Sequence, residues 1–167
     1  DVNAMVRGSS VYDIYIGRTV GPLISSVCSG VRVQFCIGAE IRRVKSVDSI
    51  YSFSAYGTVA TYIEQTNANR VTAGTGGGTD LWVGYMVDGS AEIGLAGGNG
   101  SFYLEKTQAG CNNTALQNGN SYGYRLISGF QDTFLYDTES VTCNVSLSIE
   151  GGDIANSDVK IRNHIAD

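Results

Sequence analysis

The ten residues from Ser140 to Ile149 alternate strictly between apolar and polar side chains. The apolar set comprises Val141, Cys143, Val145, Leu147 and Ile149. Successive side chains of a strand point to opposite faces, so as a strand this stretch has one apolar and one polar face. A helix would scatter the same apolar residues around its axis. We therefore predict a half-buried antiparallel strand, with much of the remaining chain covering its apolar face.

Other stretches of the chain carry strand signals of the same kind. Leu81–Val87 is apolar at nearly every position, which is typical of a strand buried on both faces. Asp88-Gly89 is a tight-turn signal, and alternation resumes over Ala91–Leu95, so we predict a β-hairpin. Further strands are predicted at Val11–Ile16, Val31–Ile37, Tyr51–Ala55, Thr58–Glu64, Ser101–Lys106, Tyr122–Ile127 and Val159–Ile165.

Two polar stretches separate these strands. Thr66–Thr79 contains a triple glycine, and Gln108–Ser121 is rich in asparagine and glycine, so both are predicted to be surface loops. The pattern gives about nine to eleven strands, no clear helix and no repeat of fixed period. It predicts a single all-β domain over residues 1–167, an antiparallel β-sandwich of immunoglobulin-like or jelly-roll type.

The four cysteines predict disulfides. Charged residues make up only 16% of the chain and hydroxyl side chains are frequent, which indicates a secreted or surface protein in an oxidising compartment. Cys28 precedes the predicted strand Val31–Ile37 by a short turn and is expected to pair with Cys36 of that strand. Cys143 lies on the inward face of its predicted strand, with Cys111 as its expected partner. Three pairings remain open. Zinc is disfavoured because no C-x-x-C pair occurs.

Several classes of function find no support. The net charge of −5 argues against a nucleic-acid partner, and no apolar run is long enough to span a membrane. The single histidine, His164, lies close to the end of the sequence and offers little basis for a Ser–His–Asp site. Neither a calcium loop nor a phosphate-binding loop is present. We therefore predict no enzyme, no metal and no cofactor.

Composition instead favours a binding surface. The chain has ten tyrosines and one tryptophan, which offer rigid contact area, and many asparagines and serines, which offer adaptable hydrogen bonds. Tyr122 and Tyr124 are expected to share a strand face beside the asparagine-rich loop. The predicted ligand-binding residues are Trp82, Asn112, Asn113, Tyr122 and Tyr124, and the expected ligand is a host glycan or a protein receptor.

Two short fragments, Y-I-G-R at Tyr15–Arg18 and G-S-F-Y-L-E-K at Gly100–Lys106, resemble pieces of bacterial fimbrial tip adhesins. The acidic, proline-poor, Gly/Ser/Thr/Asn-rich composition is similar to that of fimbrial subunits. The ending N-H-I-A-D departs from the family, whose domains usually end in a strand with a nearby tyrosine. The resemblance implies assembly by strand exchange between neighbouring subunits, with residues 2–6 and 159–165 as candidate donors.

The sequence thus predicts a non-enzymatic adhesin or pilus-type subunit, located extracellularly on a cell surface or fimbrium. A secreted carbohydrate-binding or glycan-cleaving jelly roll is the alternative. A structural capsid or appendage protein is the third reading.

Overall fold

The computed structural model describes residues 6–17, 29–34, 36–71, 81–88, 101–112, 120–127, 132–150 and 158–167. Every described element is a β-strand, which confirms the all-β prediction. Every pairing between described strands is parallel, so the predicted antiparallel β-sandwich is wrong.

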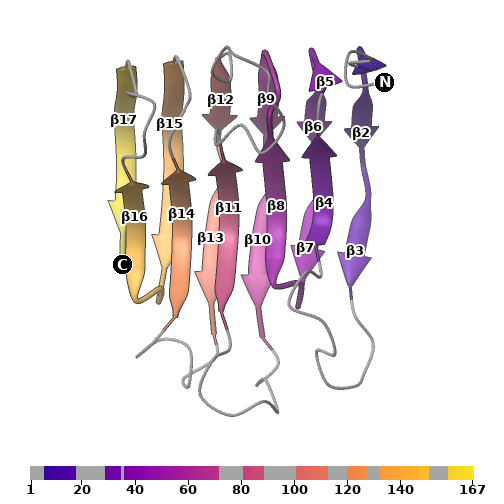
Figure 1. Ribbon diagram of the computed structural model, residues 1–167. Coiled ribbons are helices and arrows are strands. Elements are labelled where there is room, and N and C mark those ends of the chain that lie inside the picture. The colour runs from indigo at the N-terminus through magenta and orange to yellow at the C-terminus, as the bar shows by residue number, and fades with distance from the viewer. Residues whose placement is uncertain are drawn as a thin grey trace.

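The strands form two large sheets and one small one (Figure 1). Five strands make the first sheet, in the order β16 (Val145–Glu150), β14 (Ser121–Ile127), β11 (Trp82–Asp88), β8 (Tyr51–Tyr56) and β4 (Ser29–Gln34). The small sheet pairs β1 (Val6–Arg7) with β5 (Cys36–Ile37).

The second large sheet has ten strands in two arms. One arm contains β2 (Ser10–Tyr12), β6 (Glu40–Arg42), β9 (Thr61–Glu64) and β12 (Phe102–Glu105). The other arm contains β3 (Tyr15–Gly17), β7 (Lys45–Val47), β10 (Asn67–Arg70) and β13 (Gln108–Cys111). Two longer strands run through both arms, β15 (Asp132–Val141) and β17 (Asp158–Ala166).

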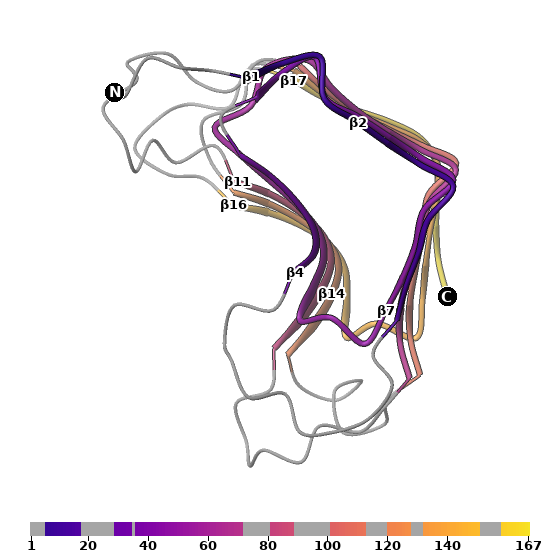
Figure 2. The same cartoon turned by 90° about the vertical axis from the view of Figure 1, so that its right-hand side faces the viewer.

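The chain winds as a coil through these sheets. Each turn places one strand in the five-stranded sheet and then crosses both arms of the ten-stranded sheet, and successive turns superimpose when viewed down the axis (Figure 2). This is the architecture of a parallel β-helix. The described residues lie along one continuous coil. Its turns are unequal in length, with Ser29, Tyr51, Val83, Tyr122 and Val145 at equivalent places, so no fixed repeat is visible in the sequence.

Left-handed residues make the corner between the two arms. At this corner each turn has one residue with a φ between 51 and 55°, and all six are polar or charged: Asp13, Arg43, Gln65, Lys106, Asp137 and Asn163. Aspartate and asparagine tolerate this conformation better than most residues. The corner residues stack because the strands on both sides are in register, and the Arg43 guanidinium binds the Asp13 carboxylate at 2.6 and 2.9 Å.

The interior is built of rows in which equivalent residues of successive turns touch. Ile41, Ile63, Leu104 and Leu135 form one aliphatic row, each at most 3% exposed. Phe53, Tyr85 and Tyr124 form an aromatic row with ring centroids 5.0 and 4.9 Å apart, close to the spacing of neighbouring strands. The Tyr85 hydroxyl lies 2.9 Å from the Thr66 hydroxyl, and the Tyr124 hydroxyl donates to the Thr107 carbonyl at 2.8 Å, so both buried phenols are satisfied.

Beside the aromatic row the two large sheets approach each other closely along a seam of small residues. The five-stranded sheet contributes Gly30, Gly84 and Gly123, which face Ser46, Ala109 and Ser140 of the ten-stranded sheet respectively. A Cβ added at Gly84 would lie 2.8 Å from the Cβ of Ala109 and 2.7 Å from the carbonyl oxygen of Gly123. Glycine is therefore required there by space.

The hairpin prediction failed because alternation and turn signals do not report strand direction. β11 matches the apolar run at Leu81–Val87, but its two edges are occupied by β8 and β14, both parallel. No edge of β11 remains for an antiparallel neighbour. Residues 89–100, which include the expected second hairpin strand, lie outside the described residues.

The alternating stretch from Ser140 to Ile149 is not one strand. β15 ends at Val141, Thr142 adopts a left-handed conformation with φ 54°, and β16 begins at Val145 in the other sheet. Of the apolar set, Cys143 and Leu147 pack against the core on the two sides of the corner, whereas Ile149 is 47% exposed. Period-two patterning therefore predicted burial for part of this stretch and missed the change of sheet.

Both predicted surface loops begin with a strand. β10 occupies Asn67–Arg70 and β13 occupies Gln108–Cys111, each paired in register on both sides. Small or polar residues can form β10 and β13 because the close approach of the two large sheets at the seam leaves little room for large side chains. The remainder of each segment, residues 72–80 and 113–119, lies outside the described residues.

Replacing Gly84 by alanine should destabilise the fold by about 1–3 kcal/mol, because the new methyl group meets the Ala109 Cβ across the seam and the Gly123 carbonyl oxygen of the neighbouring strand β14. Equilibrium urea unfolding followed by circular dichroism measures the effect. Gly110→Ala is the matched control in β13, since its only close neighbour in the described part of the chain is the Asn69 side-chain oxygen, which can move. Equal stability of the Gly84→Ala and Gly110→Ala proteins would contradict the close approach of the sheets.

Candidate functional site

The outer face of the five-stranded sheet carries aromatic and charged side chains that are suited to binding. The sheet is bent, with its convex side toward the interior and its concave side outward (Figure 2). At the bend two consecutive residues both point inward. Gly123 faces Ser140 across the seam, and the Tyr124 hydroxyl reaches the Thr107 carbonyl. Beyond this break in alternation Arg125 points outward, on the same side as Tyr122.

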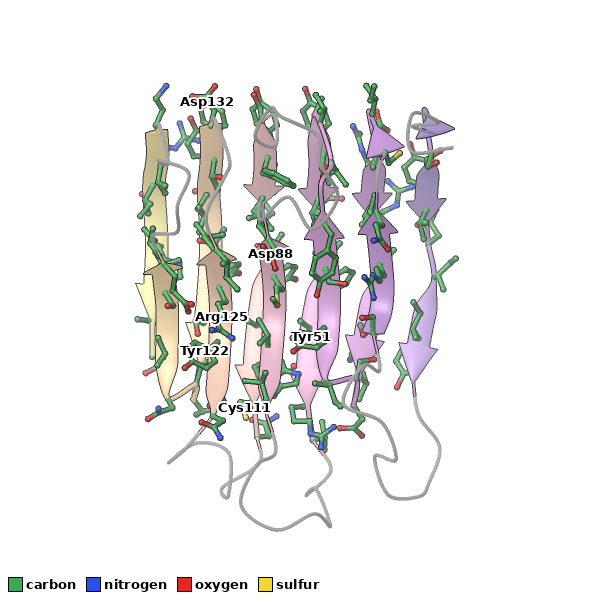
Figure 3. The ribbon with its side chains drawn as sticks, in the orientation of Figure 1. Tyr51, Asp88, Cys111, Tyr122, Arg125 and Asp132 are labelled. Atoms are coloured by element: carbon green, nitrogen blue, oxygen red, sulfur yellow. The ribbon has the colours of Figure 1, made fainter. Side chains whose placement is uncertain are left out.

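Two outward tyrosines lie at the same level on this face. Tyr51 of β8, Val83 of β11 and Tyr122 of β14 are register partners in adjacent strands, and Figure 3 shows both tyrosines in front of the sheet. Both rings are partly exposed, while Val83 between them is fully buried. The two tyrosines are two strand spacings apart, on the order of 10 Å. They lie on either side of Val83, which is itself covered and offers no exposed surface.

An arginine–glutamate pair adjoins Tyr122. The Arg125 guanidinium binds the Glu150 carboxylate through two bonds of 2.6 and 2.9 Å and lies 5.0 Å from the centre of the Tyr122 ring. The Ser148 hydroxyl donates to the same carboxylate at 3.0 Å. The hydrogen bond from Arg125 lowers the pKa of Glu150, so this carboxylate remains ionised at neutral pH. The result is a fixed array of donors and acceptors beside an aromatic ring.

A second arginine–tyrosine pair lies on the opposite side of the face. The Arg32 guanidinium of β4 is 4.5 Å from the centre of the Tyr56 ring of β8. The Tyr56 hydroxyl points to the Met86 sulfur at 3.9 Å, and burial raises the pKa of this phenol. Asp88 of β11 is the register partner of Tyr56 in the neighbouring strand β8, and Figure 3 labels it on the same face.

A competing aromatic surface lies on the ten-stranded sheet. Tyr62, Tyr103 and Phe134 stack on its outer face with centroids 4.5 and 4.6 Å apart and nearly parallel rings. The Lys160 ammonium covers the remaining face of Phe134 at 5.0 Å. Ring faces that cover one another offer only their edges to a ligand, so we interpret this stack as structural.

The predicted ligand-binding residues are not brought together. Tyr122 lies on the outer face, but Tyr124 and Trp82 are both 0% exposed and point inward, so neither can meet a ligand. Tyr122 and Tyr124 were expected to share a face, and the break in alternation at Gly123 separates them. Asn112 is exposed at the end of β13, and Asn113 lies outside the described residues.

Sequence reasoning missed Tyr51, Arg125 and Glu150. Two signals were available: Arg125 is the one charged residue in an otherwise uncharged strand, and Tyr51 begins a strand predicted from its alternation. Neither signal shows which strands are neighbours, and the site exists only because β8, β11, β14 and β16 lie side by side.

The described cysteines form no disulfide, so the predicted Cys111–Cys143 bridge is wrong. Cys111 lies at the end of β13, and Cys143 follows the next corner, with its thiol toward the carbonyl oxygens of Val141 and Ala109 at 3.5 and 3.9 Å. Burial raises the pKa of the Cys143 thiol to about 11. Cys36 is buried in β5, while Cys28, its expected partner, lies outside the described residues.

His164 is held in a fixed position by two hydroxyls. Its Nδ1 lies 2.8 Å from the Thr138 hydroxyl, its Nε2 lies 2.8 Å from the Ser146 hydroxyl, and its ring packs edge-on against Tyr124. Burial lowers the pKa of the imidazole. Because neither ring nitrogen is bound by a carboxylate, the arrangement lacks the acid of a serine triad, and we assign His164 a structural role.

The fold should lose stability as the pH falls below about 6.5, the ordinary pKa of histidine. The folded state has the lower pKa, so the unfolded chain binds the proton more readily and protonation favours unfolding. Urea unfolding at a series of pH values between about 7.5 and 5.5 tests this range. His164→Gln should flatten the profile, since His164 is the only histidine. An NMR titration giving a pKa of 6.5 or higher would contradict the assignment.

Among the described residues, no group of three or more His, Cys, Asp or Glu side chains could hold a metal ion, and no helix could cross a bilayer. No protein-family model, no curated protein and no solved structure matches the chain. The resemblance to fimbrial subunits therefore remains a prediction.

Proposed function

We propose that this protein is a non-enzymatic surface adhesin whose five-stranded sheet binds an extended glycan across its outer face. The observation that carries the proposal is the placement of Tyr51 and Tyr122 at one level, on either side of the buried Val83, with Arg125 and Glu150 adjoining. A secreted or cell-surface location fits the sparse charge of the chain.

Sugars present two kinds of surface, and the face has a partner for each. The C–H face of a pyranose packs on an aromatic ring, and its hydroxyls form hydrogen bonds with charged groups that are fixed in place. Tyr51 and Tyr122 supply the rings, at a separation on the order of 10 Å that suits successive residues of a chain running across the strands. Arg125 and Glu150 hold each other in position, so little side-chain entropy is lost on binding.

Glycan cleavage is the second candidate, because two carboxylates lie in one row of this face. Asp88 and Glu150 are register partners of Ile127 from either side, which puts them two strands apart, on the order of 10 Å. Inverting glycosidases place their carboxyl groups about 6.5–9.5 Å apart. One of the pair must be a protonated acid, and Arg125 lowers the pKa of Glu150, which excludes Glu150 from that role at neutral pH. Asp88 would therefore have to be the acid of such a pair, and a variant at Asp88 tests the cleaving alternative.

Tyr51→Ala and Tyr122→Ala should each weaken binding of the best oligosaccharide by about tenfold, equivalent to about 1.4 kcal/mol. A glycan array with the wild-type protein selects the oligosaccharide, and isothermal titration calorimetry measures the affinities. Tyr136→Ala is the matched control, since Tyr136 lies in the ten-stranded sheet beneath Arg162. Equal losses in all three variants would contradict the assignment of the site.

Chromatography of the bound oligosaccharide after prolonged incubation separates the two candidates. Unchanged chain length supports an adhesin. Cleavage that is abolished by Asp88→Asn, in a variant that still binds, would support the glycan-cleaving alternative and overturn the proposal.

A further inference from the structure

One level of the outer face alternates between tyrosines and small side chains. Across β4, β8, β11, β14 and β16 the register partners at this level are Ser29, Tyr51, Val83, Tyr122 and Val145, which we call the alternating row. Its tyrosines occupy every second strand. The rings of the interior aromatic row and of the stack on the ten-stranded sheet instead occupy neighbouring strands, with centroids 4.5 to 5.0 Å apart.

The two tyrosines of the alternating row are separate contact points. Within the row only Val83 stands between them, and it is 0% exposed, whereas both rings are partly exposed in front of the sheet (Figure 3). Their strands are two strand spacings apart, on the order of 10 Å. A ligand can therefore rest on Tyr51 and Tyr122 at once only if its own apolar faces recur at this interval.

A linear β-1,4-linked glycan chain has such a repeat. Each sugar is turned over relative to the one before it, so the same face of the chain recurs at every second sugar. With equatorial substituents the chain runs straight and advances by roughly one strand spacing per sugar. Three successive sugars would lie over β8, β11 and β14, and the first and third would pack the same face on Tyr51 and Tyr122. Chains with α-1,4 or β-1,3 links curve and fall out of step with the row.

The polar groups of the site lie on one flank of the row. Arg125 follows Tyr122 by three residues on β14, and its guanidinium binds the Glu150 carboxylate at 2.6 and 2.9 Å. Arginine has five N–H donors, so this pair can also bind hydroxyls along one edge of the sugar on Tyr122. Because Glu150 matches the charge of Arg125, the flank suits a neutral sugar better than an anionic one.

We infer that the site takes a neutral, β-1,4-linked chain of at least three pyranoses with equatorial substituents, lying along the alternating row. This inference rests on the proposed function and adds the linkage, the charge and the minimum length of the ligand. Tyr51 and Tyr122 set the linkage and the length, because only a chain that spans β11 reaches both rings. Arg125 and Glu150 orient the sugar on Tyr122.

Isothermal titration calorimetry with oligosaccharides of increasing length tests the inference on the whole chain. The probes are β-1,4-linked oligomers of glucose and of N-acetylglucosamine, from two to five sugars long. In at least one series the trimer should bind about tenfold more tightly than the dimer, because the third sugar reaches the second tyrosine, and longer oligomers should gain less. Glucose oligomers with α-1,4 or β-1,3 links should lack this step. Added salt should leave the affinity unchanged, as for a neutral ligand.

Variants at the two tyrosines locate the step. In Tyr51→Ala and in Tyr122→Ala the dimer and the trimer should bind alike, because each variant keeps only one ring of the row. Tyr51→Phe keeps the ring and should keep the step. Tyr62→Ala is the matched control, since Tyr62 is a 38% exposed tyrosine of the ten-stranded sheet. If an alanine variant fails to fold by circular dichroism, Tyr51→Leu and Tyr122→Leu decide by the same titrations.

The outcomes separate this inference from the proposed function. Equal binding of α-linked and β-1,4-linked trimers, or no step between dimer and trimer, would overturn the inference and leave glycan binding in place. A step that survives in both alanine variants would overturn it as well, because the ligand would then lie elsewhere. Failure of every glycan on the array to bind would overturn the proposed function itself.

Discussion

In-register parallel hydrogen bonding between successive turns is the constraint on which the structure depends. Once one turn is paired with the next, every residue is placed over its equivalent at the strand spacing, about 4.8 Å. The aromatic row of Phe53, Tyr85 and Tyr124 has this separation between its rings, and so do the stacked rings of Tyr62, Tyr103 and Phe134. Stacking of like residues supplies both the core and much of the outer surface.

Corners determine how these rows are arranged around the axis. Polar left-handed residues between the two arms allow each turn to change direction without a long loop, and their side chains form a row of their own, with an ion pair at Arg43 and Asp13. The seam of small residues sets the separation of the two large sheets. Gly84 and Gly123 bring the five-stranded sheet close to Ala109 and Ser140, and the next residue of each strand, Tyr85 or Tyr124, can then reach across the interior.

The same geometry decides which side chains lie on the outer face of the five-stranded sheet. Because two consecutive residues point inward at the bend, Tyr122 and Arg125 emerge on one side although their spacing would put them on opposite faces of a regular strand. Row-wise stacking then places the side chains of four strands within reach of one extended ligand.

The sequence alone determined that the chain is all-β, that Leu81–Val87 is a strand buried on both faces and that Cys143 and Leu147 turn inward, because period-two alternation reports burial. It did not determine strand direction, since a two-faced strand can pair either way. The corner at Thr142 and the inward turn of Tyr124 were also invisible, because a single left-handed residue or a bend leaves no pattern of its own. Only the tertiary structure decided which strands are neighbours, and with that the gathering of Tyr51, Tyr122, Arg125 and Glu150, because register between distant segments is set by packing rather than by local sequence.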